Sequence, residues 1–93
     1  NRATVLVQIQ AIRLIRTKKT GEQMAFLRVT DTKRTLDVTL FPESYRQYAS
    51  ILEEGGMGYI TGRVQERDGQ LQLVLEKLEP ISLEKFWILL ENR

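Results

Sequence analysis

The sequence contains no cysteine and no histidine. Without thiols the chain can form neither a disulfide bond nor a thiolate metal site. Without imidazole it lacks the usual zinc ligands and the Ser-His and Cys-His pairs of nucleophilic catalysis. We therefore expect no metal site and no cofactor, and the absence of cysteine fits a cytoplasmic protein.

Long apolar runs, a phosphate-binding loop and clustered acids are also absent. No apolar run approaches the ~20 residues that cross a bilayer, so we expect no membrane partner. The stretch Gly55-Gly56-Met57-Gly58 lacks the lysine and helix that follow a phosphate-binding loop. Asp31, Asp37 and Asp68 are too far apart in sequence for an Asp-x-Asp cluster that could hold Mg²⁺. We expect no catalytic residue in this segment.

What remains is a short chain of ordinary composition. Its 93 residues suit one domain, and 42% apolar with 28% charged residues is typical of a folded protein. The sequence starts at Asn1 instead of methionine, so we expect it to be a segment of a longer protein.

Charge is distributed unevenly along the chain. Residues 1–34 contain eight Lys/Arg and two Asp/Glu, whereas residues 35–93 contain six Lys/Arg and ten Asp/Glu. The first part therefore carries +6 and the second −4, which agrees with the net charge of +2. A basic first part favours an anionic partner, the alternative being charges that happen to gather on solvated faces.

Apolar alternation predicts three strands at residues 4–17, 23–31 and 34–41. In the first, alternation through Val5, Val7 and Ile9 resumes on the opposite parity at Ile12 and Leu14. Such a switch predicts a β-bulge near Gln10-Ala11, in a long bent strand that serves two parts of a small barrel.

In the second predicted strand, Ala25, Leu27 and Val29 should face inward. The outward side chains should then be those of Met24, Phe26, Arg28 and Thr30. In the third, Leu36, Val38 and Leu40 should share the inward face.

A helix of about three turns should follow the third strand. Pro42 suits a first helical position, where its missing N–H is not needed. Gly55 and Gly56 should end the helix. Its apolar stripe, at i, i+3, i+4 and i+7, is Tyr45, Tyr48, Ala49 and Leu52.

Two more strands and a helical tail complete the prediction. The fourth strand should cover 57–66, with Ile60, Gly62 and Val64 on one face. Asp68-Gly69 predicts a tight hairpin into a fifth strand that ends at Pro80. Residues 82–90 are apolar enough for a short helix, in which Phe86 and Trp87 should dock on the barrel or on a neighbouring domain.

Three strands, a helix and two strands is the order of the OB-fold, a five-stranded, partly open, all-β barrel with a helix between strands three and four. An SH3-like barrel usually lacks this helix, and a ferredoxin-like fold needs two helices and four strands. We expect an OB domain at residues 4–80 and a helical C-terminal extension at 81–93.

The ligand face of an OB-fold is formed by strands two and three, flanked by the turns after strands one and four. Lysine and arginine on this face would neutralise phosphates, and Phe26 would offer a ring for base stacking. Alternatively, Phe26 packs beneath a loop, and Lys18 and Lys19 belong to an ordinary solvated turn. The predicted nucleic-acid-binding residues are Arg13, Arg16, Lys18, Lys19, Met24, Phe26, Arg28, Lys33, Arg34, Arg63 and Arg67.

Three stretches resemble one family: Thr17-Lys18-Lys19-Thr20-Gly21-Glu22-Gln23-Met24-Ala25-Phe26-Leu27, Leu36-Asp37-Val38-Thr39-Leu40-Phe41-Pro42-Glu43-Ser44-Tyr45, and Gly62-Arg63-Val64-Gln65-Glu66-Arg67-Asp68-Gly69-Gln70-Leu71-Gln72-Leu73. Together they are similar to the OB domain near the C-terminus of the bacterial replicative DNA polymerase III α subunit. The resemblance covers residues 5–80 and leaves the tail from Phe86 to Leu90 unmatched. It carries over Lys18, Lys19, Met24, Phe26 and Arg63.

The resemblance implies a module that holds single-stranded template DNA near the active site of a DNA-directed DNA polymerase, whose catalytic acids lie on another domain. Two alternatives stay open. The module could dock a protein, such as a clamp loader, a single-strand-binding protein or another polymerase domain, or it could bind an RNA anticodon. The basic first part favours nucleic acid over protein, and the three stretches favour DNA over RNA. We expect the isolated domain to be monomeric.

Overall fold

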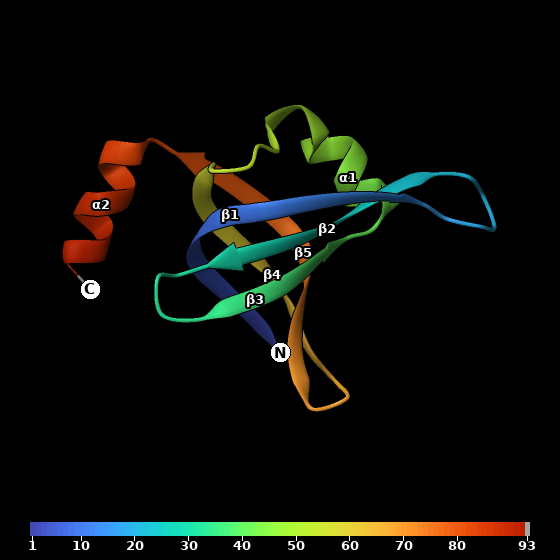
Figure 1. Cartoon of the computed structure of the whole chain (residues 1–93), viewed down its shortest axis with the longest axis horizontal. Coiled ribbons are helices and arrows are strands. Elements are labelled where there is room, and N and C mark those ends of the chain that lie inside the picture. The colour runs from blue at the N-terminus through green and yellow to red at the C-terminus, as the bar shows by residue number, and fades with distance from the viewer. Residues whose placement is uncertain (93) are drawn as a thin grey trace.

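A computed structural model of the chain describes residues 1–92. The chain forms a closed five-stranded barrel with the strand order β1-β2-β3-β5-β4. The strands are β1 (Arg2–Arg16), β2 (Gln23–Thr30), β3 (Thr35–Leu40), β4 (Met57–Arg67) and β5 (Gln70–Ile81). Helix α1 (Pro42–Tyr48) and the 3₁₀ turn η1 (Ala49–Ile51) follow β3, and α2 (Leu83–Glu91) follows β5 (Figure 1). This order confirms the predicted OB-type barrel with a helical tail.

The long first strand takes part in two pairings. Its C-terminal half pairs with β2 and its N-terminal half with β4, and the register with β2 shifts between Ile9 and Ala11. The bulge predicted from the parity switch is therefore present. It lets Val7 and Ile9 on one side of it, and Ile12 on the other, all pack on one core.

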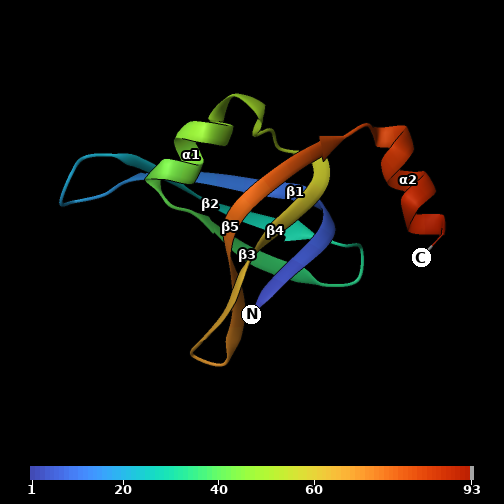
Figure 2. The same ribbon diagram turned by 180° about the vertical axis from the view of Figure 1, so that it is seen from behind.

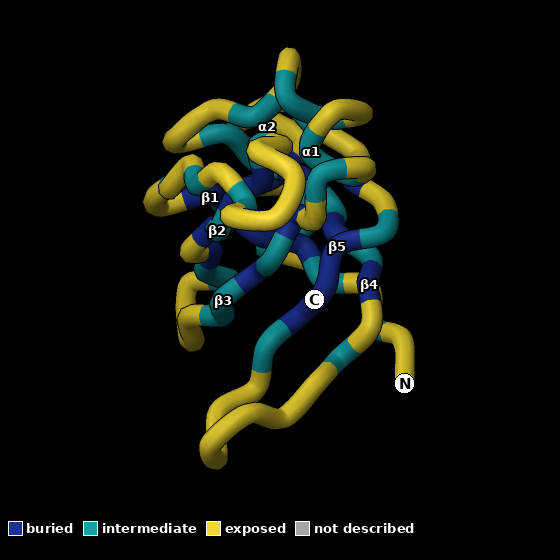
Figure 3. Tube along the Cα trace, turned by 90° about the vertical axis from the view of Figure 1, so that its right-hand side faces the viewer, coloured by how far each residue is buried: buried dark blue, intermediate teal, exposed yellow. Residues whose placement is uncertain are grey.

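The core is formed by the inward residues of all five strands. Ala25, Val29, Leu40 and Ile60 have no exposed surface, and Leu73 is 1% exposed. Figure 3 shows the buried positions gathered in the centre of the barrel, while the tip of the β4–β5 hairpin is exposed. Inward alternation in β2, β3 and β4 is as predicted.

Helix α1 and the segment after it close one end of the barrel. Tyr45, Tyr48 and Leu52 pack against the core, as their spacing predicted, and Pro42 stands at the start of the helix. The predicted three-turn helix is wrong in detail, because regular α-helix stops at Tyr48 and a 3₁₀ turn continues to Ile51. Figure 2, which shows the molecule from behind, has α1 lying across one end of the barrel.

Strand β5 differs most from the prediction. It continues through Pro80 to Ile81, and Pro80 pairs with Gly58 near the end of the ladder. The register between β4 and β5 shifts between Thr61 and Gly62, a second bulge that the sequence analysis did not predict. The hairpin before it is as predicted, with positive φ at Asp68 (53°) and Gly69 (80°).

The C-terminal helix α2 lies beside β4 and buries one aromatic side chain. Phe86 is 1% exposed, as expected of a docking residue, and the Ser82 hydroxyl caps the helix by accepting from the Lys85 N–H at 3.1 Å. Trp87 is 52% exposed, so it does not dock on the barrel, and the alternative that it docks on a neighbouring domain stays a prediction. Within residues 1–92, neither helix is long and apolar enough to span a membrane.

Candidate nucleic-acid interface

One row of side chains crosses the outside of the barrel from strand to strand. Arg13 is paired with Phe26, Phe26 with Thr39, Thr39 with Val74, and Val74 with Arg63. Because their chain neighbours point into the core, these five residues face outward. We call them the cross-strand row.

The residue pairs of the cross-strand row also show that the strands are inclined to the barrel axis. From Arg63 the next partner is Arg2, so the path returns to β1 eleven positions before Arg13. A closed sheet with such a stagger has strands strongly inclined to the barrel axis. Because of this inclination β1 lies beside both ends of the row: Arg13 belongs to it, and Arg2 is the next partner after Arg63.

At the start of the row, Arg13 lies over the ring of Phe26. The guanidinium carbon is 5.2 Å from the ring centroid, which is within the range of a cation–π contact. Phe26 is half-buried and Arg13 is exposed. The contact places a flat cation beside an aromatic ring, and nucleic-acid-binding proteins stack bases on both kinds of group.

In the middle of the row the side chains of Thr39 and Val74 expose little surface, and the far end carries the charge of Arg63. Val74 is only 8% exposed although it faces outward, and Thr39 is half-buried. Arg63 is exposed and forms no ion pair with any residue in 1–92. The low surface of Thr39 and Val74 between Arg13 and Arg63 gives an extended ligand room to lie across β3 and β5 with a cation at each side.

A second row runs parallel to the first and carries an ion pair. Arg28 is paired in register with Asp37, and its Nε lies 3.3 Å from Asp37 Oδ1. Both side chains remain about half exposed, at 60% and 43%. Because the carboxylate balances its charge, Arg28 contributes less to the net positive charge of this face than the sequence prediction assumed.

The loop of residues 17–22, between β1 and β2, is folded by its own hydrogen bonds. The Gly21 N–H donates to the Thr17 carbonyl at 2.9 Å, and the two hydroxyls of Thr17 and Thr20 lie 2.6 Å apart. Arg16 Nη1 donates to the Gly21 carbonyl at 2.9 Å. Arg16 therefore braces the loop from below. Gly21 has φ +71°, which favours glycine at this point.

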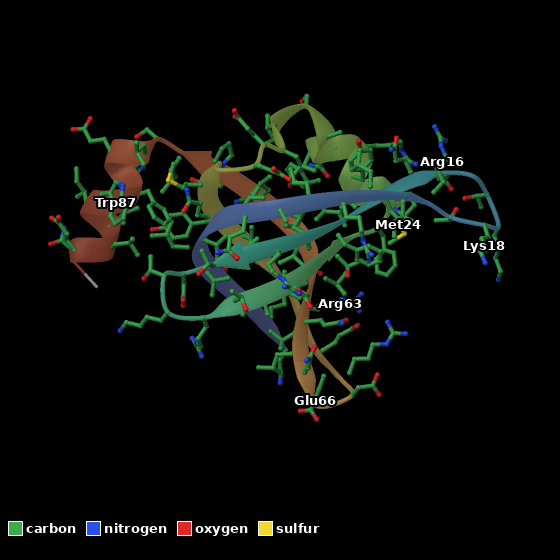
Figure 4. All side chains as sticks on the ribbon, viewed as in Figure 1. Arg16, Lys18, Met24, Arg63, Glu66 and Trp87 are labelled. Carbon is green, nitrogen blue, oxygen red and sulfur yellow. The ribbon has the colours of Figure 1, made fainter. Side chains whose placement is uncertain are left out.

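The two lysines of this loop are exposed. Within residues 1–92, neither Lys18 nor Lys19 has an ion-pair or hydrogen-bond partner. Glu22, at the base of the loop, forms an ion pair with Arg46 of α1. The loop is thus tied to α1 on one side and carries two exposed lysines, and Figure 4 shows Lys18 on the same side of the molecule as Arg16 and Met24.

The remaining predicted residues lie apart from these two groups. Lys33 and Arg34 belong to the turn after β2, at the opposite end of that strand from Lys18. Arg34 lies 3.8 Å from Asp31. Arg67 ends β4, at the tip of the β4–β5 hairpin. The structure therefore brings together only part of the predicted set.

Met24 is a predicted contact residue whose side chain the structure shows to be mostly buried. Alternation places it on the outward face, where it pairs with Ile15, but it is only 9% exposed. A long, flexible apolar side chain readily folds down over neighbouring surface, and period-2 alternation does not register this. Met24 offers little surface to a ligand.

The family to which this fold belongs is shown by comparison with known proteins. Residues 3–81 match the tRNA_anti-codon family, described as an OB-fold nucleic acid binding domain. The chain belongs to this OB-fold family. The match spans all five barrel strands but β1's first residue, and it stops before α2.

Sequence relatives place the OB domain more narrowly. It is 52% identical over 90 residues to the DNA polymerase III subunit alpha of Streptococcus pyogenes, covering 97% of this chain and 9% of the relative. It is 30% identical over 82 residues to the same subunit of Staphylococcus aureus strain MSSA476, covering 88% of this chain and 8% of the relative. The resemblance inferred from the three stretches is confirmed, but the tail from Phe86 to Leu90, which was left unmatched, also lies within the 90 aligned residues. The chain spans about a tenth of the length of these relatives.

A solved structure supports the fold independently. A mitochondrial single-stranded DNA binding protein from S. cerevisiae superimposes with a TM-score of 0.68 at 11% identity, covering 87% of this chain and 93% of that one. At such low identity the likeness concerns the fold alone.

Sequence reasoning missed three residues of the OB domain's outer face. Thr39 and Val74 complete the cross-strand row, and Asp37 neutralises Arg28. Their parity was readable, but their neighbours depend on the register between strands, above all the parallel pairing of β3 with β5. Within residues 1–92 no group of three acidic side chains is arranged to hold a metal ion.

Proposed function

We propose that this OB domain binds single-stranded DNA along the cross-strand row, with the loop of residues 17–22 beside it. The observation that carries the proposal is the contact of Arg13 with Phe26 at one end of the row and, at the other, Arg63, which has no ion-pair partner within residues 1–92. Stacking on the Arg13–Phe26 surface would hold a base, and Arg63, Lys18 and Lys19 would neutralise phosphates.

The wider role follows from the relatives. We infer that the domain serves a bacterial replicative DNA polymerase in the cytoplasm, where it holds the template strand near an active site on another domain. Supporting this are the 52% identity to a polymerase III α subunit and the small fraction of that subunit covered here. In this arrangement the OB domain does no chemistry itself.

Fluorescence anisotropy with labelled oligo-dT and oligo-rU across a salt series tests the proposal. We expect log K to fall with log salt by about 0.7 for each phosphate contacted on a single strand. Tighter binding of oligo-dT than of oligo-rU would favour the DNA role over the anticodon-type RNA role. Absence of oligo-dT binding at low salt would overturn the proposal for this domain.

A docking role for a replisome protein or another polymerase domain is a second candidate. It is favoured by α2, which leaves Leu83, Trp87 and Ile88 between 50% and 57% exposed. Trp87→Glu would abolish such docking and leave oligonucleotide binding unchanged, which separates the two roles.

A further inference from the structure

The barrel end opposite α1 is open and leads into a cavity of about 490 Å³. It exists because β3 and β5 pair over only three positions, Asp37–Thr39 with Gln72–Val74. On the N-terminal side of Gln72, Gln70 and Leu71 pair with β4 alone as a two-stranded ribbon, whose hairpin tip extends from the barrel in Figure 3. Residues at the β2–β3 end line the opposite side of the cavity. The volume lies within the ~300–1,000 Å³ of small-ligand sites.

The walls of the cavity are aliphatic. They include Val5 and Val7 of β1, Leu36 of β3, and Val64, Leu71 and Leu73 of the β4–β5 ribbon. Leu71 is 58% exposed, the largest exposed fraction among the large apolar side chains. An exposed leucine on the wall of a concave apolar site is typical of a surface that a ligand covers.

The rim of the cavity is polar but electrically balanced. Arg28 pairs with Asp37 at 3.3 Å and Arg34 with Asp31 at 3.8 Å. Gln70, also on the rim, has no hydrogen-bond partner for its amide within residues 1–92. Two cations balanced by two carboxylates favour an uncharged group with donors and acceptors over a phosphate.

The cavity mouth adjoins the proposed DNA face. Arg28 lies two residues after Phe26 on β2, and Asp37 two before Thr39 on β3, so both stand one row from the cross-strand row. A DNA strand bound on the cross-strand row would therefore pass next to the opening, separated from it by a single row of side chains. Arg34, with 84% of its side chain exposed, stands at the mouth where a phosphate would remain in solvent.

We propose that this cavity takes up one unstacked nucleobase of the strand bound on the cross-strand row; the inference rests on the proposed function. A nucleobase has apolar faces and a polar edge, which match aliphatic walls and a balanced polar rim. Proteins that extrude a base hold it in this way, between apolar side chains and with hydrogen bonds to its edge.

The test uses oligo-dT in which one 2-aminopurine or one abasic site is moved along the strand. With the wild-type chain, one position should show a distinct fluorescence change on binding, and an abasic site there should weaken binding about 5- to 10-fold. Val64→Trp, which fills the cavity, should remove that fluorescence change and leave the abasic site without effect. Ile51→Trp, at the closed end of the barrel, is the size-matched control.

Leu71→Ala guards against misfolding of the filled variant, because Leu71 is exposed and its truncation should leave the fold intact. It should weaken oligo-dT binding about 3- to 10-fold. The cavity proposal would be overturned if oligo-dT bound tightly and its affinity did not change with the position of the abasic site, with Val64→Trp or with Leu71→Ala. The proposed function would then still stand. If the wild-type chain bound no oligo-dT, both the cavity proposal and the proposed function would be overturned. If an apolar peptide shifted the NMR methyl signals of Leu71 and Leu73 and deoxynucleosides did not, the cavity would be assigned to a protein ligand.

Discussion

The contact between Phe26 and Arg13 is the most important one of the proposed interface. Their cation–π contact at 5.2 Å orients both side chains before any ligand arrives. Preorganisation reduces the side-chain entropy lost on binding, so this pair should contribute more than two separate surface residues would.

Phe26→Ala should weaken oligo-dT binding by about 1–3 kcal/mol, the usual range for loss of a stacking aromatic. The unfolding free energy should change less than in a core truncation, because the ring is only half-buried. Anisotropy titration and urea denaturation measure the two quantities. Trp87→Ala removes an exposed aromatic side chain away from the row, and an equal affinity loss there would contradict the assignment.

Single residues also show where sequence reasoning reached its limit. The sequence predicted Phe26 and Arg63 on the outward face, and the structure agrees, because parity alone decides this. It did not predict that Asp37 neutralises Arg28 or that Met24 is buried, because both depend on neighbours across the sheet. Which charged side chains remain without an ion-pair partner depends on the register between neighbouring strands.

At the scale of elements, the loop of residues 17–22 is a preformed turn instead of a flexible tether. Its internal hydrogen bonds and the Arg16 contact to Gly21 hold the backbone without using either lysine. The lysines are therefore available for phosphates and should matter little for folding.

Lys18→Glu combined with Lys19→Glu should weaken oligo-dT binding at least tenfold at low salt and reduce the salt slope, with a nearly unchanged melting temperature. Lys77→Glu combined with Lys85→Glu makes the same charge change on β5 and α2, away from the row. If the two double variants weaken binding equally, net charge and not the loop determines affinity. If the loop variant unfolds, the lysines are structural.

The β4–β5 ladder depends on a glycine that faces the core. A Cβ at Gly62 would run into the carbonyl oxygen of Val74 and the side chain of Leu73. Gly62→Ala should lower the unfolding free energy by about 1–3 kcal/mol, the usual effect of overpacking. Urea denaturation measures this, with the exposed Gln65→Ala as the control expected to stay within about 0.5 kcal/mol. A Gly62→Ala chain as stable as wild type would contradict the close approach of Val74 and Leu73 to Gly62.

The elements differ in how far sequence specified them. The β1 bulge was predicted because apolar residues changed parity there. The bulge opposite Thr61/Gly62 was missed although it leaves a similar signal: the extra residue is Glu76 of β5, and the buried leucines change parity there from Leu75 to Leu78. Pro80 was read as a strand end, but a proline near the end of a ladder needs to give up only one donor.

At the scale of the whole molecule, the closed barrel combines a basic outer face with an open apolar end. The element order was sufficient to predict the OB-type fold, because few topologies place one helix between strands three and four. The cavity was not predictable, since it arises from the short β3–β5 pairing. Barrel closure pairs every strand on both sides over part of its length, which leaves little free sheet edge, and the isolated domain is expected to be monomeric.

The location of the DNA on the molecule is tested most directly by a ¹⁵N–¹H NMR titration of the 93-residue chain with oligo-dT. The account predicts that amide shifts concentrate at Arg13, Phe26, Thr39, Val74 and Arg63 and in the loop of residues 17–22. Signals of Thr4, Tyr59 and Thr61, on the outer face of the β1–β4 pair, should stay unmoved. Shifts centred on that pair or on α2, with the cross-strand row silent, would contradict it.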